Sequence, residues 1–188
     1  MSGNSRWVYV GSRTEREKGA RGEGISVFRM NTETGAWTTV EVVGGMVNPS
    51  FLAFDRTGKF LHTVHGYHTG ISSFRIDAST GKITKIGFEK TEMNPVHLTP
   101  DPTNRWMFVA NYASGSVTSM PIREDGTLGP THDVVKLPGK PGPNKVQQPH
   151  SRPHHCPMDR GQRFYVVPDQ GLDKTFVCVD HELPDHSQ

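Results

Sequence analysis

The sequence predicts an all-β protein built of repeated units of four antiparallel strands, and three observations lead to that prediction. The 188 residues include 20 glycines and 14 prolines, an excess typical of chains with many tight turns. No stretch shows the hydrophobic period of a helix, whereas short alternating apolar segments recur throughout. The same segments return with a period of about 46 residues, which marks an internal repeat.

Two interleaved sets of segments define the repeat. Members of the first set begin with glycine and close in a turn: GISVFRMNTETG from Gly24, GISSFRIDASTG from Gly70 and GSVTSMPIREDG from Gly115. Members of the second set carry Asp55, Asp101 and Asp159 in register: NPSFLAFDRTGKF from Asn48, NPVHLTPDPTNRW from Asn94 and RPHHCPMDRGQRF from Arg152. Each unit therefore predicts an apolar innermost strand, a turn opened by aspartate, a second strand led by an aromatic residue, and two further strands around a Gly turn.

The turns have a physical basis. Aspartate accepts hydrogen bonds from its own turn, and Gly or Asn tolerates a positive φ, so the paired segments are predicted to form hairpins. Gln162 is the exception to this pattern, because the glycine of its turn has moved to Gly161.

Four short strands in about 46 residues are typical of a β-propeller blade, and a β-sandwich is the alternative. From Trp7 to Asp180 the pattern gives about fourteen strands, or about three and a half blades. Since a propeller needs about four blades to close, we expect an apolar flank that something must cover. We expect one partial propeller over residues 1–180 and a tail, residues 181–188, that does not match the repeat.

One interval breaks the period. Pro95 and Pro153 lie 58 residues apart, against 46 for Pro49 and Pro95. The surplus is the stretch LPGKPGPNKVQQPHS, which begins at Leu137. A long loop at one place in a repeat array usually lies on the functional face, and a disordered excursion is the alternative.

Strand order gathers polar residues at one rim, because the start of one strand and the end of its antiparallel neighbour coincide. The starts of the innermost strands contribute Asn48, Asn94, His97, Arg152, His154 and His155. The ends of the second strands contribute His65, Asn111 and Asp169. Phe51, His97 and His155 share one repeat position. A ring of polar groups at a propeller mouth is a candidate anion or sugar site, although imidazoles at strand starts often only satisfy backbone groups.

Composition argues against several classes of partner. The 21 Lys and Arg nearly cancel the 19 Asp and Glu, so the net charge of +2 supplies no basic stripe for nucleic acid. No apolar segment reaches the ~18 residues of a membrane span. The start, MSGNSRWVYV, lacks the charged and apolar regions of a signal peptide, so we expect a cytoplasmic protein.

Other site chemistries fit the sequence poorly. The run from His150 to Cys156 contains zinc-ligand types, but its prolines prevent a helix, and on a strand His154 and Cys156 would face away from His155. No G-x-S-x-G elbow and no glycine-rich phosphate loop occur. Two cysteines are too few for a disulfide framework. We therefore expect neither a metal nor a cofactor.

Several motifs together resemble the β-propeller lactonases, a family that includes the propeller-type 6-phosphogluconolactonases and is related to the fungal carboxymuconate cyclases. The matching stretches run from about Trp7 to Val179: YVGS from Tyr9, NPSFLA from Asn48, FRID from Phe74, PVHL from Pro95, FVANYASGSV from Phe108 and VPDQGLDK from Val167. The resemblance implies seven blades and about twice this length, so the chain is similar to the first half. Where the family carries Pro-His-x-His, this chain places Arg152 before Pro153 and keeps His154.

The resemblance implies that water opens the ring of a sugar lactone. His154 would act as general base toward water, because imidazole titrates near neutral pH. His97 or His155 would orient that base or assist the leaving alkoxide. The implied substrate is a small anionic lactone, and no cofactor is required.

The implied substrate-binding residues come from the rim and the long loop. A guanidinium suits bidentate recognition of an oxyanion, so Arg152, with Lys140 or Lys145, would hold the phosphate of the lactone. Asn111 and Asp169 would bind sugar hydroxyls, and His65 would be a further substrate-binding residue.

Two other functions stay open from the sequence. A cycloisomerase acting on a carboxylated muconate would use the same His and Arg groups. A binding module or inactive half-propeller would keep the blades without a working site, since half of a toroid supplies half of a central pocket. A second chain that completes the propeller is a further expectation.

Overall fold

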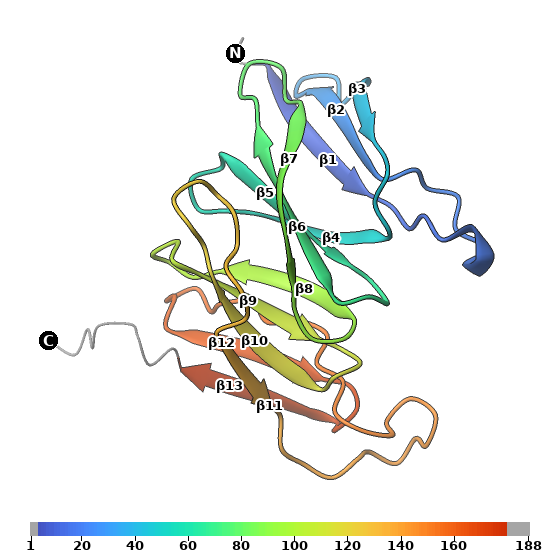
Figure 1. Cartoon of the computed structure of the whole chain (residues 1–188), viewed down its shortest axis with the longest axis vertical. Coiled ribbons are helices and arrows are strands. Elements are labelled where there is room, and N and C mark those ends of the chain that lie inside the picture. Colours follow the sequence, from blue (N-terminus) through green and yellow to red (C-terminus); the bar gives the residue numbers. More distant parts are fainter. Residues whose placement is uncertain (1–3, 180–188) are drawn as a thin grey trace, which may run out of the picture.

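The computed structural model describes residues 4–179, whose strands form four antiparallel sheets (Figure 1). The first sheet contains β1 (Ser5–Gly11), β2 (Ile25–Asn31) and β3 (Trp37–Val43). The second contains β4 (Pro49–Phe54), β5 (Phe60–His65), β6 (Gly70–Ile76) and β7 (Ile83–Lys90). The third contains β8 (Pro95–Pro100), β9 (Trp106–Asn111), β10 (Ser116–Pro121) and β11 (Asp133–Lys136). The fourth contains β12 (Phe164–Asp169) and β13 (Lys174–Val179), and a short 3₁₀ helix, η1 (Arg16–Lys18), lies between β1 and β2.

The sheets are the predicted blades. In each complete sheet the strands pair in chain order, as in β4-β5-β6-β7, and every pairing is antiparallel. Neighbouring blades lie side by side: the innermost strand β4 contacts the innermost strand β8 of the third blade and also contacts β1 of the first blade. The structure confirms the all-β propeller architecture, with thirteen strands in the described residues where the sequence predicted about fourteen.

The aspartate turns form by the predicted mechanism. The Asp101 carboxylate accepts hydrogen bonds from the backbone N–H groups of Thr103 and Trp106, at 2.9 and 2.7 Å. Asp55 and Asp159 accept the equivalent pairs in their own turns. The residue at the left-handed position of each turn is Gly58, Asn104 or Gln162, with φ of 68°, 59° and 56°. Gln162 therefore adopts the turn conformation although its glycine has moved by one residue.

The hydrophobic core is divided among the spaces between blades. Ile25, Phe74 and Ile83 belong to the cluster between the first and second blades. Val64, Leu98 and Met120 belong to the next cluster, between the second and third blades. The third cluster joins the third blade to β12 and β13 through residues such as Ala110, Tyr165 and Val167. Because each blade packs only on its neighbours, stability is distributed along the array.

Two blades depart from the four-stranded pattern. β1 takes the place that β5 and β9 take in their sheets, so the first sheet has no innermost strand within the described residues. In the fourth sheet the predicted innermost strand at 152–158 forms only isolated bridges, Pro153 with Asp169 and Met158 with Tyr165. Pro153 and Pro157 lack the N–H groups that a continuous ladder requires. The tail predicted at residues 181–188 lies outside the described residues.

Candidate functional site

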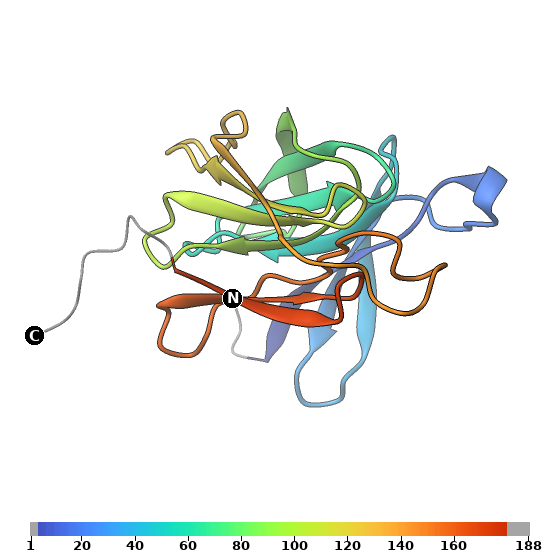
Figure 2. The ribbon, with the colours of Figure 1, turned by 90° about the horizontal axis from the view of Figure 1, so that it is seen from below.

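One rim of the blades carries both long loops. Figure 2 shows the β1–β2 loop in blue and the loop that ends near residue 151 in orange, extending toward the same side. Strand pairing explains this, because Pro49 pairs with His65, Pro95 with Asn111 and Pro153 with Asp169. The predicted grouping of strand starts and strand ends at one rim is therefore present in the structure.

Three equivalent repeat positions meet at the inner side of this rim. The rings of Phe51 and His97 lie 4.4 Å apart between centroids, and the rings of His97 and His155 lie 3.7 Å apart. His97 is buried, with 5% of its surface exposed, whereas His155 is exposed. The backbone N–H of Cys156 donates to Nδ1 of His97 at 3.2 Å, which leaves the ring proton on Nε2.

The electrostatics of this histidine group favour neutral imidazoles. Burial, together with the positive charges that His155 and His154 would carry, lowers the pKa of His97 to about 3. Burial and the neighbouring His154 also lower the pKa of His155. Neutral imidazole nitrogens can accept protons, which is the property that a general base needs.

Tyr112 links a cation to the exposed His154. The guanidinium carbon of Arg152 lies 5.2 Å from the Tyr112 ring centroid, and the His154 ring meets the same ring edge-on at 5.5 Å. The Tyr112 hydroxyl accepts a hydrogen bond from Nη1 of Arg152 at 3.2 Å and donates to the Gln170 side chain at 3.1 Å. This arrangement holds the cation and the imidazole on one aromatic side chain.

The Arg152 guanidinium is engaged on one side only. Its Nη1 donates to the Tyr112 hydroxyl and to the carbonyls of Val146 and Gln147 in the long loop. Its Nε is buried and has no hydrogen-bond partner, and no described residue accepts from Nη2. Because Nε is buried, Nη2 is the guanidinium nitrogen that is left to bind a carboxylate or phosphate.

Two predicted rim residues use their polar atoms inside the chain. Asp169 is buried and accepts from the N–H groups of Arg152 and Leu172, at 2.7 and 3.0 Å, and from the Ser151 hydroxyl. Asn111 is fully buried and donates to the Val109 carbonyl and the Thr118 hydroxyl. Their predicted contacts with sugar hydroxyls stay predictions, and in this structure both side chains fasten the blade itself.

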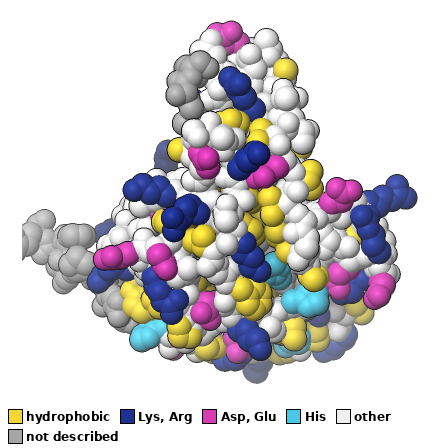
Figure 3. All heavy atoms as spheres, turned by 45° about the horizontal axis from the view of Figure 1, so that its top comes forward, with side chains coloured by type: hydrophobic (Ala, Val, Ile, Leu, Met, Phe, Trp, Pro, Cys, Tyr) yellow, Lys and Arg dark blue, Asp and Glu magenta, His cyan; other side chains and the backbone are white. Residues whose placement is uncertain are grey.

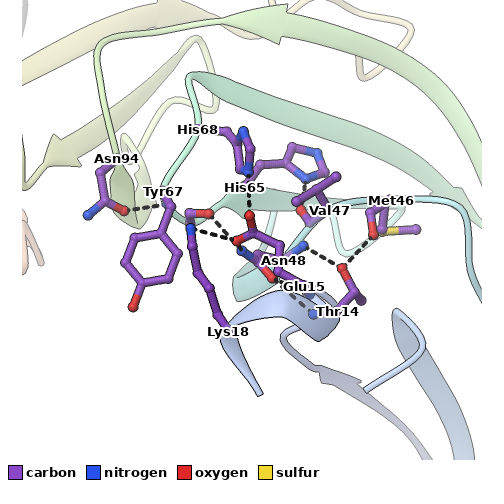
Figure 4. Close-up of polar contacts among 11 residues, drawn as sticks. Thr14, Glu15, Lys18, Met46, Val47, Asn48, His65, Tyr67, His68 and Asn94 are labelled. Atoms are coloured by element: carbon purple, nitrogen blue, oxygen red, sulfur yellow. Dashed lines mark hydrogen bonds and ion pairs between the residues drawn. The ribbon is translucent and has the colours of Figure 1, made fainter. Parts of the chain in front are cut away.

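His65 and Asn48 lie in a second polar network at the rim (Figure 4). His65 donates from Nδ1 to the Val47 carbonyl and accepts at Nε2 from the Ser72 hydroxyl, at 2.8 Å. Burial lowers its pKa, so the ring is neutral. Asn48 accepts from the Thr14 N–H at 2.9 Å and donates to the Glu15 carboxylate, which ties the β1–β2 loop to the second blade.

Asn48, Asn94 and Arg152 occupy one repeat position and act alike. Each reaches back to the loop of the preceding blade: Asn48 to Thr14, Asn94 to the N–H of Tyr67 at 2.7 Å, and Arg152 to Tyr112. In the third case the neutral amide is replaced by a guanidinium. The repeat thus places a positive charge beside His154 without changing the way in which neighbouring blades are joined.

The long loop is fastened at its far end and bears exposed lysines. Gly142 N–H donates to the Gly171 carbonyl at 2.9 Å, and Gln148 donates to the Gln170 carbonyl. Lys140 and Lys145 are exposed and make no hydrogen bond or ion pair with a described residue. The structure leaves them free to approach a ligand at the rim but does not bring them to the histidine group.

Sequence reasoning missed Tyr112 and Gln170. Both follow directly after a predicted rim residue, Asn111 and Asp169 respectively, and both lie inside motifs that carried the family resemblance. That position after the strand end was the available signal. Among residues 4–179, no group of three or more His, Cys, Asp and Glu side chains is arranged to hold a metal ion. The same residues contain no helix with the length and apolar character of a membrane span.

The face of the molecule in Figure 3 carries Lys and Arg side chains interspersed with Asp and Glu, and hydrophobic side chains between them. This mixed distribution is the one that the near-balanced composition predicts.

Comparisons with known proteins agree with these features. Residues 7–182 match the family described as "Lactonase, 7-bladed beta-propeller". A 6-phosphogluconolactonase of Bacillus subtilis is 28% identical over 172 residues, which cover 90% of this chain and 48% of the relative. The chain thus spans about half the length of the curated relative that it matches.

Solved structures show the same half-length match. A Bacteroides fragilis protein described as a candidate 6-phosphogluconolactonase superposes with a TM-score of 0.85 at 28% identity, covering 94% of this chain and 49% of that one. A periplasmic gluconolactonase of Pseudomonas aeruginosa superposes with a TM-score of 0.78 at 28% identity, covering 93% and 49%.

Proposed function

Because the chain belongs to the seven-bladed β-propeller lactonase family, we propose that it serves the hydrolysis of a sugar lactone that bears an anionic group. The name of the Bacillus relative makes 6-phosphogluconolactone the first substrate to test. The observation that carries the proposal is the Arg152 guanidinium, which Tyr112 holds beside the exposed His154 and whose Nη2 has no acceptor among the described residues. We include the expected cytoplasmic location in the proposal, although the Pseudomonas relative is periplasmic.

In the proposed reaction His154 takes a proton from water as the water oxygen attacks the lactone carbonyl carbon. The tetrahedral intermediate then breaks the bond between the carbonyl carbon and the ring oxygen. The leaving alkoxide takes the proton back from the His154 imidazolium, so that one water is added and a hydroxy acid is released. His155, kept neutral and packed on His97, assists by accepting a hydrogen bond from the attacking water.

Arg152 binds the anionic group of the substrate through Nη2, the guanidinium nitrogen that has no acceptor within the described residues. Its Nη1 stays hydrogen-bonded to carbonyl groups of the long loop, so the loop orients the guanidinium without occupying Nη2. Lys140 and Lys145 add positive charge from the same loop, which raises the local concentration of an anionic lactone.

The test measures hydrolysis of 6-phosphogluconolactone and of unphosphorylated gluconolactone by the purified full chain. We expect His154→Ala to lower kcat by about 100-fold, a usual size for loss of a general base. We expect Arg152→Gln to raise KM for the phosphorylated lactone by about tenfold and to leave the unphosphorylated one nearly unaffected. His132→Ala, an exposed histidine outside the rim, is the matched control.

Unchanged rates in both variants would remove His154 and Arg152 from the mechanism. Absence of hydrolysis by a well-folded wild-type chain would contradict the proposal and favour a binding module, which is consistent with a chain that spans about half of its relative. Turnover of a carboxylated muconate in place of the lactones would favour the cycloisomerase alternative.

A further inference from the structure

The rim opposite the histidines contains a cleft, formed where the aspartate turns of the second and third blades meet. The turns opened by Asp55 and Asp101 follow the ends of β4 and β8, whereas the histidine rim lies at the starts of those strands. A cleft of about 720 Å³ opens between the two blades at this end. Its floor includes the ring of Phe60 and the side chain of Ile122.

Four cationic side chains line the cleft, two from each blade: Lys59 and Arg75 from the second, Arg105 and Arg123 from the third. All four are exposed. The three ion pairs found among residues 4–179 involve other side chains, so none of the four cations is paired with a carboxylate. Collecting like charges without partners is unfavourable, and a bound anion would relieve the repulsion.

The guanidinium groups have free donors toward the cleft. The side chain of Arg75 makes no hydrogen bond with a described residue, and its guanidinium lies 5.9 Å from the centroid of the Phe60 ring. Arg105 uses only Nε, which donates to the Thr103 hydroxyl at 3.0 Å. Arg123 uses only Nη1, which donates to the Leu128 carbonyl and the Thr127 hydroxyl. The remaining N–H groups suit an oxyanion.

The carboxylates of the cleft neutralise it only in part, although the positive charges of Arg123 and Arg75 act on the Asp125 carboxylate. Asp55 is buried and saturated by donors from its own turn and from Asn104. Asp125 directs one oxygen into its own turn, where Thr127 donates from N–H and hydroxyl. Glu124 is exposed and makes no contact with the four cations. The four cations therefore outnumber the two carboxylates at the cleft's surface.

Comparison of the repeats shows that one of these cations is not required by the fold. In the strand register Arg75 pairs with Phe60 and Pro121 pairs with Trp106, so Arg123 holds the position of Asp77 in the second blade. Asn31 holds the same position in the first blade, and Asn31 and Asp77 each accept hydrogen bonds from their turn. In the third blade Asp125 has taken over that capping role. Arg123 is consequently free to serve another purpose.

We propose that this cleft binds a small molecule with at least two anionic groups, phosphates or carboxylates, at a site distinct from the histidine rim. The two guanidiniums of Arg75 and Arg105, one from each blade, provide separate anion contacts across the cleft. Lys59 and Arg123 complete the positive lining. The proposal is independent of the proposed lactone hydrolysis.

The test is calorimetric titration of the full chain at low ionic strength, with inorganic pyrophosphate as probe, citrate as the carboxylate arm and orthophosphate as the single-anion arm. We expect saturable binding of pyrophosphate or citrate that is tighter than that of orthophosphate. Amide resonances of residues 103–105 and 123–127 should shift in the NMR spectrum on binding. The stronger of the first two ligands identifies the anionic group.

The double variant Arg75→Gln with Arg105→Gln should weaken binding by at least about tenfold, because two charge-assisted contacts are lost. Arg123→Asn, which restores the residue type of the first blade, should weaken it as well. Arg163→Gln is the matched control, since Arg163 holds the position of Arg105 in the next repeat but does not line the cleft. Absence of binding, or equal affinity in the double variant and the wild type, would overturn the proposal. Shifts confined to resonances near Arg152 would overturn it as well.

Discussion

At the scale of single residues, His97 illustrates how the repeat places a titratable group inside the protein. Phe51 holds the same repeat position one blade earlier, and their rings pack together. The position is therefore one that an apolar ring fills without difficulty. An imidazole there must remain neutral, because burial disfavours its charged form.

This environment makes stability depend on pH. The folded-state pKa of His97 is about 3, below the unfolded value near 6.5, so the unfolded chain binds more protons between these values. The contribution of His97 to the free energy of unfolding is therefore complete above about pH 6.5, and it is lost as the pH falls toward 3. We expect about 2 kcal/mol of unfolding free energy to be lost from this group between pH 7 and pH 5. Urea denaturation at the two pH values measures it.

His97→Phe, which copies Phe51, should reduce that pH dependence by about 2 kcal/mol. The variant also leaves the Cys156 N–H without its acceptor, at a cost of about 1–3 kcal/mol that does not change with pH. A variant with the same slope as wild type would show that His97 does not titrate as described. His62, whose pKa burial lowers to about 4, and His65, whose pKa burial also lowers, contribute to the pH dependence that remains.

Tyr112 positions Arg152 through its hydroxyl and His154 through its ring. Within the proposed hydrolysis, Tyr112→Phe keeps the ring and removes the hydrogen bond to Arg152. We expect a rise in KM of about fivefold with kcat changed less than about twofold, since the cation loses one anchor. Tyr112→Leu should lower kcat as well. Equal effects of both variants on kcat would indicate a structural role only.

The identity of rim residues could be predicted from strand order, whereas their orientation could not. Asp169 and Asn111 lie where the repeat predicts, but both are buried and bonded within the chain. Their partners, such as Ser151 and Thr118, come from other strands and loops. A sequence pattern of one strand does not report which neighbour fills a hydrogen bond, so the inward orientation emerged only from the packed blades.

At the scale of elements, local chemistry decided the hairpins. The conformation of each aspartate turn, including the left-handed residues Gly58 and Asn104, is determined by residues within the turn itself. The structure confirms these turns as predicted. The segment at 152–158 was predicted as a strand from its alignment with earlier repeats and became two isolated bridges. Its prolines were visible in the sequence, but the repeat alignment outweighed them in the prediction.

The junction between the long loop and the fourth blade is tightly packed at Gly171. A Cβ there would lie 1.7 Å from the His150 carbonyl oxygen and 2.8 Å from the Arg152 nitrogen, both backbone atoms. Gly171→Ala must therefore displace the loop, at a cost of about 1–3 kcal/mol. We expect faster tryptic cleavage after Lys145, which Val146 follows, together with a lower melting temperature.

Gly139→Ala is the control for this junction, because its Cβ would meet only side-chain atoms, the nearest at 3.0 Å from Leu172. Wild-type cleavage rates in Gly171→Ala would show that the loop tolerates the added methyl group, and that the rim does not depend on this contact.

At the scale of the whole molecule, the array has open edges at both ends. Within the described residues β1 has no innermost neighbour, and β13 pairs only with β12. On β13, Phe176 and Cys178 pack inward, whereas Val177 and Val179 on the other face are 63% and 55% exposed. In the second and third blades the corresponding space is filled by the next blade.

The exposed valines predict association of the full chain. Apolar surface and unpaired strand edges favour pairing with another chain, so a second chain that completes or covers the array remains our proposal. We expect sedimentation velocity to show a mass that rises with concentration over the micromolar range. Val177→Lys with Val179→Lys should shift the protein toward monomer, because each lysine would have to be desolvated in the interface. Thr175→Lys, on the same face near the start of β13, controls for added charge alone. A monodisperse monomer at every concentration in the wild type would show that the flank needs no cover.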